Sequence, residues 1–298
     1  MEHVQADGLA PEGVTGRDCA PSVLVGLVGG GIQLSRTPRM QEAEAAAQGL
    51  RLCYRLFDTD TRRLEHPVGE ILDAAELCGF AGLNVTFPHK IAVMDHLDEL
   101  SDAARAVGAV NTVIFAGGRR RGHNTDRWGF AESFRRGMGD APRARVLQLG
   151  AGGAGVAVAH ALLDCGVGTL LIADTDTARA DALADRLEAS YPGRAQVSDA
   201  QTALRGDIDG AVNCTPVGMA KLPGVPLDAD LLHPGLWVAD IVYFPLETAL
   251  LAAARARGCG VLPGSGMAVF QAVRAFELFT GRGADPERMR ATFESFRE

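Results

Sequence analysis

The stretch that decides the fold is Arg145–Asp174, RVLQLGAGGAGVAVAHALLDCGVGTLLIAD. It begins with a short apolar run of β character, breaks into glycines at positions 150, 152, 153 and 155, and continues as an apolar helix over 156–165. A second apolar run, 169–173, ends on Asp174. The order of strand, tight turn, helix and strand predicts a βαβ unit of a parallel sheet.

The same stretch predicts a nucleotide site. Glycines let the backbone approach a pyrophosphate, a helix N-terminus offers unbonded amides, and an acid at the end of the second strand accepts hydrogen bonds from ribose hydroxyls. We therefore expect a Rossmann-type dinucleotide site with Asp174 at the ribose. Its backbone contacts are expected from Gly150, Ala151, Gly152, Gly153, Ala154 and Gly155. The alternative is a glycine-rich packing turn without a ligand.

Length and composition indicate a globular protein of more than one domain. The chain has 298 residues, of which 47% are hydrophobic and 22% charged, and domains typically comprise about 100–150 residues. The net charge of −8 gives no electrostatic footprint for nucleic acid or an anionic membrane. We expect neither as a partner. A monomer and a homodimer both remain open.

The six cysteines lie without a C-x-x-C pair or a metal-type spacing. We expect them to be reduced and mostly buried, the compartment to be the cytoplasm, and no metal to be bound. Residues 1–21 contain acids, glycines and prolines without a signal-peptide pattern, and we expect them to form a mobile tail. No apolar run of the sequence reaches the roughly 18–20 residues of a membrane span.

Alternation of strand and helix patterns organises the remaining chain into two domains. We expect an α/β substrate-binding domain at 22–125, including a β-hairpin around the glycines at 117 and 118, and a dinucleotide-binding domain at 126–265, including a linking helix from 126 to 138. Two closing helices, 267–280 and 286–297, can cap the second domain or return to the first.

Four polar stretches of the first half lie in loops punctuated by glycine or proline, where α/β folds bind ligands. Taken singly, each can simply satisfy its own backbone, and Asp126 can cap the helix that follows it. The stretches are Ser35-Arg36-Thr37-Pro38, Gly82-Leu83-Asn84-Val85-Thr86-Phe87-Pro88-His89-Lys90, Gly108-Ala109-Val110-Asn111-Thr112 and Gly122-His123-Asn124-Thr125-Asp126.

Together with the glycine loop, these stretches resemble the shikimate dehydrogenase family from about residue 23 to the C-terminal helices. Further matches are Asn213-x-Thr215-Pro216-x-Gly218-Met219, Asp240-x-Val242-Tyr243-x-Pro245 and Gly266-Met267-x-x-x-Gln271-Ala272. The resemblance implies a substrate domain followed by a dinucleotide domain, a cleft between them, and a C-terminal helix of about 266–298 that returns to the first.

The resemblance also implies roles for single residues in oxidising a ring hydroxyl of a cyclic polyhydroxy carboxylic acid. Ser35 and Thr37 would bind the carboxylate. Thr86, Asn111 and Gln271 would bind ring hydroxyls, since amides offer both a donor and an acceptor. Additional cofactor contacts would come from Arg179, Thr215, Val242 and Met267.

Lys90 and Asp126 would flank the reacting alcohol, which must lose a proton as its hydride leaves. Two roles for Lys90 remain open. It can take the proton, or it can stay cationic, which a neighbouring carboxylate favours, and stabilise the developing oxyanion while Asp126 orients it. The neighbouring His89 and His123 lack a metal-type spacing.

The cofactor is expected to be NAD. Family members that use NADP typically follow the second strand with an Asn-Arg-Thr turn, whereas here Asp174-Thr175-Asp176 would repel a 2′-phosphate. With the Ser-x-Thr pair, this resembles the NAD-dependent branch that oxidises quinate and shikimate. The alternatives are an NADPH-dependent biosynthetic shikimate dehydrogenase, an aminoshikimate-type paralogue and a non-catalytic dinucleotide-sensing regulator.

Overall fold

A computed structural model describes residues 22–60 and 67–296, which form two compact units. Within these residues, the first unit comprises 22–60, 67–99, 112–121 and 275–296, and the second comprises 100–111 and 122–274. The expected tail, 1–21, lies outside the described residues. The segment 100–111 thus groups by its contacts with the second unit, and the end of the chain groups with the first.

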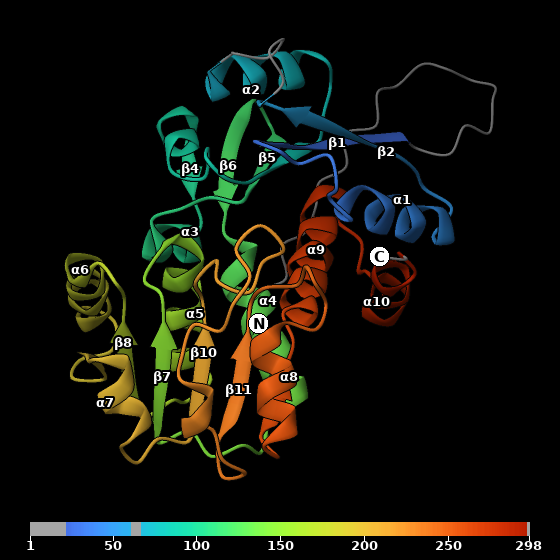
Figure 1. The fold of residues 1–298 in the computed structure, drawn as a ribbon. Coiled ribbons are helices and arrows are strands. Elements are labelled where there is room, and N and C mark those ends of the chain that lie inside the picture. Colours follow the sequence, from blue (N-terminus) through green and yellow to red (C-terminus); the bar gives the residue numbers. More distant parts are fainter. Residues whose placement is uncertain (1–21, 61–66, 297–298) are drawn as a thin grey trace, which may run out of the picture. The chain divides into compact units, whose positions relative to one another are not determined.

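The first unit is built on a six-stranded mixed sheet (Figure 1). β1 pairs in parallel with β2 and with β3, and β3 pairs antiparallel with β5. The strands, in their order across the sheet, are β2 (Arg51–Asp58), β1 (Ser22–Gly29), β3 (Gly82–Val85), β5 (Thr112–Ala116), β6 (Arg119–His123) and β4 (Glu99–Leu100). The carboxyl ends of β1, β2 and β3 therefore lie at one edge.

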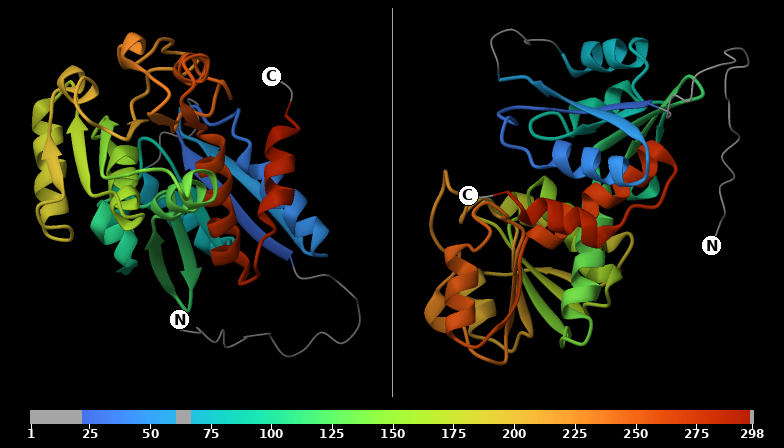
Figure 2. Two further views of the ribbon diagram at one scale, coloured as in Figure 1. Left: turned by 90° about the horizontal axis from the view of Figure 1, so that it is seen from below. Right: turned by 90° about the vertical axis from the view of Figure 1, so that its right-hand side faces the viewer.

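Helices cover both faces of this sheet, and Figure 2 (right) shows α1 (Thr37–Ala47) and α2 (Val68–Leu77) on opposite sides of it. A 3₁₀ turn, η1 (Ala92–His96), lies in the same unit. The last helix, α10 (Pro286–Glu294), packs on α1 through the buried Glu44, which accepts hydrogen bonds from both Arg288 Nε (2.6 Å) and the amide of Asp285 (3.0 Å). These bonds hold the end of the chain on the first unit.

The second unit is built on six parallel strands. Their order is β12 (Gly260–Leu262), β11 (Trp237–Asp240), β10 (Gly210–Asn213), β7 (Arg145–Leu149), β8 (Thr169–Ala173) and β9 (Ala195–Val197). The chain starts in the middle at β7, runs outward through β8 to β9, and then returns to β10 on the other side. Doubly wound sheets bind ligands at the carboxyl ends of the strands where the order reverses, which here are β7 and β10.

Two apolar clusters cover the two faces of the parallel sheet. One joins alternate residues such as Val146 and Ile172 to helices α4 (Thr125–Met138), α5 (Gly153–Asp164) and α6 (Thr177–Glu188). The other joins the intervening residues, such as Leu147 and Leu171, to α7 (Ala200–Leu204) and α8 (Ala249–Ala256). Side chains of a strand point alternately to the two faces, so the inner strands carry apolar side chains on both faces.

The predicted fold class, an α/β mixed sheet plus a Rossmann-type parallel sheet, is confirmed. Helix α5 starts at Gly153 rather than at Val156, because its glycine-rich first turn carries no apolar period. The sequence did not predict the short elements β4, β9 and α7, because each is too short to show a periodic apolar pattern. The remaining elements, α3 (Asp102–Val107), η2 (Ala229–Leu231) and α9 (Ser265–Thr280), complete the described chain.

Cysteine burial differs from the expectation. Cys214 and Cys259 are buried and Cys165 is half-buried, but Cys53 and Cys78 are exposed, so the prediction of mostly buried thiols is wrong for these two. Cys53 lies on the outermost strand, β2, where one face is open to solvent. Cys19 lies outside the described residues. None of the helices searched in 22–60 and 67–296 has the length and hydropathy of a membrane span.

Candidate functional site

The loop after β1 carries Ser35 and Thr37 in the first unit. Asp58, at the end of β2, holds the start of this loop, because its carboxylate accepts from the Gly31 amide and from Gln33 Nε2, both at 2.9 Å. Burial opposes the charge, but these hydrogen bonds lower the pKa of Asp58. The ionised carboxylate of Asp58 therefore holds the start of the loop through these two hydrogen bonds.

Both candidate carboxylate ligands lie at the N-terminus of α1. Thr37 is the first residue of this 11-residue helix, and its amide donates to Ser35 Oγ at 3.3 Å. Two hydroxyl groups thus lie beside the first turn of a helix, where backbone amides and the helix dipole favour an anion. The arrangement is chemically suited to a carboxylate.

The turn after β3 carries Thr86 and Lys90, also in the first unit. The Thr86 amide donates to the carbonyl of Val28, and the Gly30 amide donates to the carbonyl of Phe87, both at 2.9 Å. The turn is thereby bonded to the start of the loop after β1. His89, which precedes Lys90, is hydrogen-bonded to the Thr59 hydroxyl at 3.0 Å. Burial lowers the pKa of His89, although the negative charge of Asp60 acts in the opposite direction.

Asn111 and Asp126 lie in the second unit, where Asn111 is bonded to the start of α4. The Thr125 amide donates to Asn111 Oδ1 (2.8 Å), and Asn111 Nδ2 lies 2.9 Å from Thr125 Oγ1. The residue that caps α4 is Asn124, whose side chain accepts from the Arg127 amide. Asp126 is buried in the first turn and does not cap the helix, so the expectation that it could act only as a cap is wrong.

The glycine loop follows β7 at the reversal of strand order. Gly150 has φ +95°, and a Cβ there would lie 2.9 Å from the Cys214 carbonyl carbon, so only glycine fits between the two loops. The buried Gln148 donates to the carbonyls of Gly150 and Gly155, both at 2.9 Å. Within the described residues, Cβ atoms at Gly152 and Gly153 would meet nothing within 4 Å.

Asp174 closes this loop from the end of β8. Its Oδ2 accepts from the Ala151 amide at 2.7 Å and its Oδ1 accepts from the Asp176 amide at 2.9 Å. Burial raises the pKa of Asp174, but these amides, Arg179 and Thr175 outweigh it, and the net pKa lies below its usual range. Arg179 itself pairs with Asp176 at 3.1 Å.

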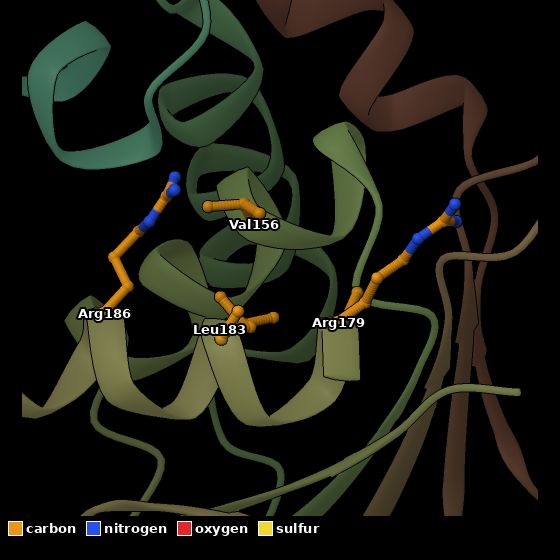
Figure 3. Close-up of a pocket in the computed structure, with 6 residues that line it drawn as sticks. Val156, Arg179, Leu183 and Arg186 are labelled. Atoms are coloured by element: carbon orange, nitrogen blue, oxygen red, sulfur yellow. The ribbon is translucent and has the colours of Figure 1, made fainter. Parts of the chain in front are cut away.

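A pocket of about 130 Å³ lies between the start of α5 and α6. Figure 3 shows Arg179 and Arg186 on α6, on either side of Leu183, with both side chains extending away from the helix. Arg186 donates to the carbonyl of Val107 at 2.7 Å. Arg179, Arg186 and Ala151, which belongs to the glycine loop, therefore line one pocket.

The other candidate residues lie on loops and helix α9 of the second unit. Thr215 follows β10, and Val242 follows β11 and is buried. Met267 is 9% exposed and belongs to an apolar core cluster, while Gln271 Nε2 donates to the carbonyl of Ala268 at 3.2 Å. A Cβ on Gly129 would lie 2.7 Å from the Gln271 amide nitrogen, so α4 and α9 pack closely at this point.

Several polar residues that hold these loops had no predicted role. They are Asp58, Gln148, Asn213 and Asp240, and each lies in a strand, at its last position or next to it. A polar side chain at the end of a buried strand was the signal that could have identified them, because buried polar groups require hydrogen-bond partners. Within 22–60 and 67–296, no group of three or more His, Cys, Asp or Glu is arranged to hold a metal ion.

The second unit fits a dinucleotide. The loop after β7 leaves open space at Gly152 and Gly153, the first turn of α5 supplies amides, and an ionised acid stands at the end of β8. These are the groups that bind a pyrophosphate and a ribose. The fold and this loop therefore define a dinucleotide-binding α/β protein.

Comparison with known proteins identifies the family. Models described as shikimate dehydrogenase substrate binding domain and shikimate 5′-dehydrogenase C-terminal domain match residues 27–113 and 264–292. A shikimate dehydrogenase (NADP(+)) of Streptomyces avermitilis is 56% identical over 91% of this chain and 94% of its own. A quinate/shikimate dehydrogenase (NAD(+)) of Corynebacterium efficiens is 51% identical over 92% and 98%.

A solved structure agrees with the sequence matches. The quinate dehydrogenase from Corynebacterium glutamicum in complex with NAD superposes with a TM-score of 0.88 at 48% identity, over 93% of this chain and 100% of that one. The chain belongs to the shikimate dehydrogenase family, and it is an oxidoreductase that acts on CH–OH groups with NAD or NADP.

Proposed function

We propose that the protein oxidises quinate and shikimate with NAD, giving 3-dehydroquinate and 3-dehydroshikimate. The observation that carries the cofactor choice is Asp174. Its carboxylate stands at the end of β8 with a lowered pKa, and Asp176 adds a second negative charge two residues later. A 2′-phosphate would meet both charges, whereas ribose hydroxyls can donate to Asp174.

The substrate assignment rests on the residues of the loops. Ser35 and Thr37, beside the first turn of α1, are proposed to bind the carboxylate. Thr86, Asn111 and Gln271 are proposed to bind ring hydroxyls. Lys90 and Asp126 are proposed to act on the reacting alcohol.

In the reaction the C–H bond of a secondary alcohol breaks, its electron pair leaves as hydride, the C–O bond becomes a carbonyl and the hydroxyl proton is released. The dinucleotide supplies the hydride acceptor when it is bound. Lys90 either takes the hydroxyl proton or stabilises the oxygen as negative charge develops on it, with Asp126 as its orienting carboxylate. The products are a ring ketone, NADH and a proton.

Initial rates of NAD and NADP reduction, measured with quinate and with shikimate at mildly basic pH, test the proposal. We expect a higher kcat/KM with NAD for both substrates. NADP reduced far better than NAD would contradict the cofactor assignment, and no turnover with any of the four pairs would contradict the activity.

NADP is the second candidate, and a specific observation favours it. Arg179 and Arg186 line the pocket near the glycine loop, and either guanidinium can bind a phosphate. The 56% identical relative from Streptomyces is named as NADP-dependent. Against it, Arg179 is already paired with Asp176. If NADP is the cofactor, Arg179→Ala lowers the rate with NADP much more than the rate with NAD.

Asp174→Asn is expected to raise the ratio of kcat/KM for NADP to kcat/KM for NAD by about tenfold, because it removes a charge that repels the 2′-phosphate. The amide keeps one oxygen acceptor for the Ala151 amide but loses the hydrogen bond from the Asp176 amide. Steady-state kinetics with both cofactors measure the ratio. Asp181→Asn, the same charge change on the exposed side of α6, is the control. An unchanged ratio in Asp174→Asn would refute the role given to this carboxylate.

A further inference from the structure

A buried chain of hydrogen bonds connects the loops after β10 and β11 in the second unit. Asp240, at the end of β11, is 2% exposed, and its Oδ1 accepts from Asn213 Nδ2 and from the Val242 amide, both at 2.9 Å. Its Oδ2 accepts from the Thr248 hydroxyl at 2.7 Å. One carboxylate thus bonds to β10, to its own loop and to the start of α8.

Asn213 carries the connection into the loop after β10. Its Oδ1 accepts from the amide (3.0 Å) and the hydroxyl (2.7 Å) of Thr215. Its Nδ2 donates to the Val217 carbonyl at 3.0 Å, besides Asp240. The Val217 amide in turn donates to the Thr215 hydroxyl at 3.2 Å. The polar atoms of the Asn213 side chain are therefore all engaged.

Thr248 anchors the other end of the chain. It is fully buried and caps α8, with its hydroxyl oxygen accepting from the Leu251 amide at 3.3 Å while its hydrogen goes to Asp240. Figure 1 shows α8 beside β11. Since the members of this network bond to one another, loss of one member removes a hydrogen bond from a buried neighbour, which is costly in a low-dielectric interior.

We propose that Asp240, Asn213 and Thr248 form a positioning network that joins the loops after β10 and β11 into one body and so places Thr215 and Val242 for the dinucleotide. None of the three has to touch the cofactor. The part of this inference that concerns cofactor affinity rests on the proposed function. The joining of the two loops follows from the hydrogen bonds alone.

Amide hydrogen exchange of the cofactor-free protein tests the joining. The amides of Thr215, Val217 and Val242 bond to network side chains and serve as reporters. In Thr248→Val, which keeps the side-chain shape but removes the hydroxyl, exchange at all three is expected to rise by about tenfold. Thr248→Ser restores it. Faster exchange at Val242 alone would show that the loops are not joined.

The dissociation constant of the dinucleotide tests the positioning. In Thr248→Val it is expected to rise by about tenfold, while KM for the polyhydroxy acid at saturating dinucleotide changes by less than about twofold. Asp199→Ala is the matched control, because the exposed Asp199 caps helix α7 through the Thr202 amide (2.8 Å) outside the network. It is expected to lower Tm without changing either readout.

The outcomes separate the two proposals. Faster exchange in Thr248→Val at an unchanged dissociation constant would overturn the positioning role. A wild-type protein without turnover would overturn the proposed function, while the exchange comparison would still decide whether the network joins the loops.

Discussion

Replacement of Lys90 by alanine is expected to lower kcat by about 10²–10⁴-fold, the contribution of one positioned acid–base group. Lys90 lies on the turn after β3, which is fixed by backbone bonds to β1 and to the loop after it. The glycine loop and the other residues proposed to bind the dinucleotide all belong to the second unit, so cofactor affinity is expected to stay unchanged. Steady-state kinetics measure kcat, and titration with NAD measures the affinity for the cofactor.

His89→Ala is the control for Lys90→Ala, since its ring bonds to the Thr59 hydroxyl and no role in the reaction is proposed for it. We expect a kcat within a few-fold of wild type. Lys90→Arg keeps the positive charge but changes the shape of the donor group. Partial activity in Lys90→Arg would favour stabilisation of the oxyanion, and complete loss would favour proton transfer. Full activity of Lys90→Ala would refute a catalytic role.

Gly155→Ala is expected to cost about 1–3 kcal/mol of the free energy of unfolding, even without a cofactor, because the added methyl group overpacks the loop. Its Cβ would overlap the Gly150 carbonyl oxygen and lie 3.2 Å from Gln148 Nε2. Both contacts belong to the bonds that hold the loop to the start of α5. Thermal unfolding and titration with NAD should both show a loss.

Gly152→Ala is expected to separate stability from binding. A Cβ at Gly152 meets nothing within 4 Å and the backbone φ is −73°, which alanine adopts without strain. We expect an unchanged Tm and a dissociation constant for NAD raised by about tenfold, since the methyl group would occupy space used by the pyrophosphate. Gly283→Ala, an equally open glycine in the first unit, is the control. Unchanged affinity in Gly152→Ala would refute the phosphate site.

The sequence by itself determined the elements whose signals are local. The glycines after β7 predicted the turn and the helix, because each depends on backbone geometry within a few residues, while the ribose role of the acid after β8 stays a prediction. The alternating apolar runs predicted a parallel sheet covered on both faces, and the two clusters around Val146 and Leu147 bear this out.

Only the tertiary structure decided the strand order and which polar residues hold the loops. Asp240 bonds to Asn213, 27 residues earlier, and Asp58 bonds to Gly31, also 27 residues earlier. Such bonds form because parallel strands end at a common edge, and they leave no period in the sequence. The cap of α4 at Asn124 rather than Asp126 is likewise a matter of geometry that residue type alone does not distinguish. Local backbone chemistry thus specified the cofactor loop, and long-range hydrogen bonding specified the residues that hold it in place.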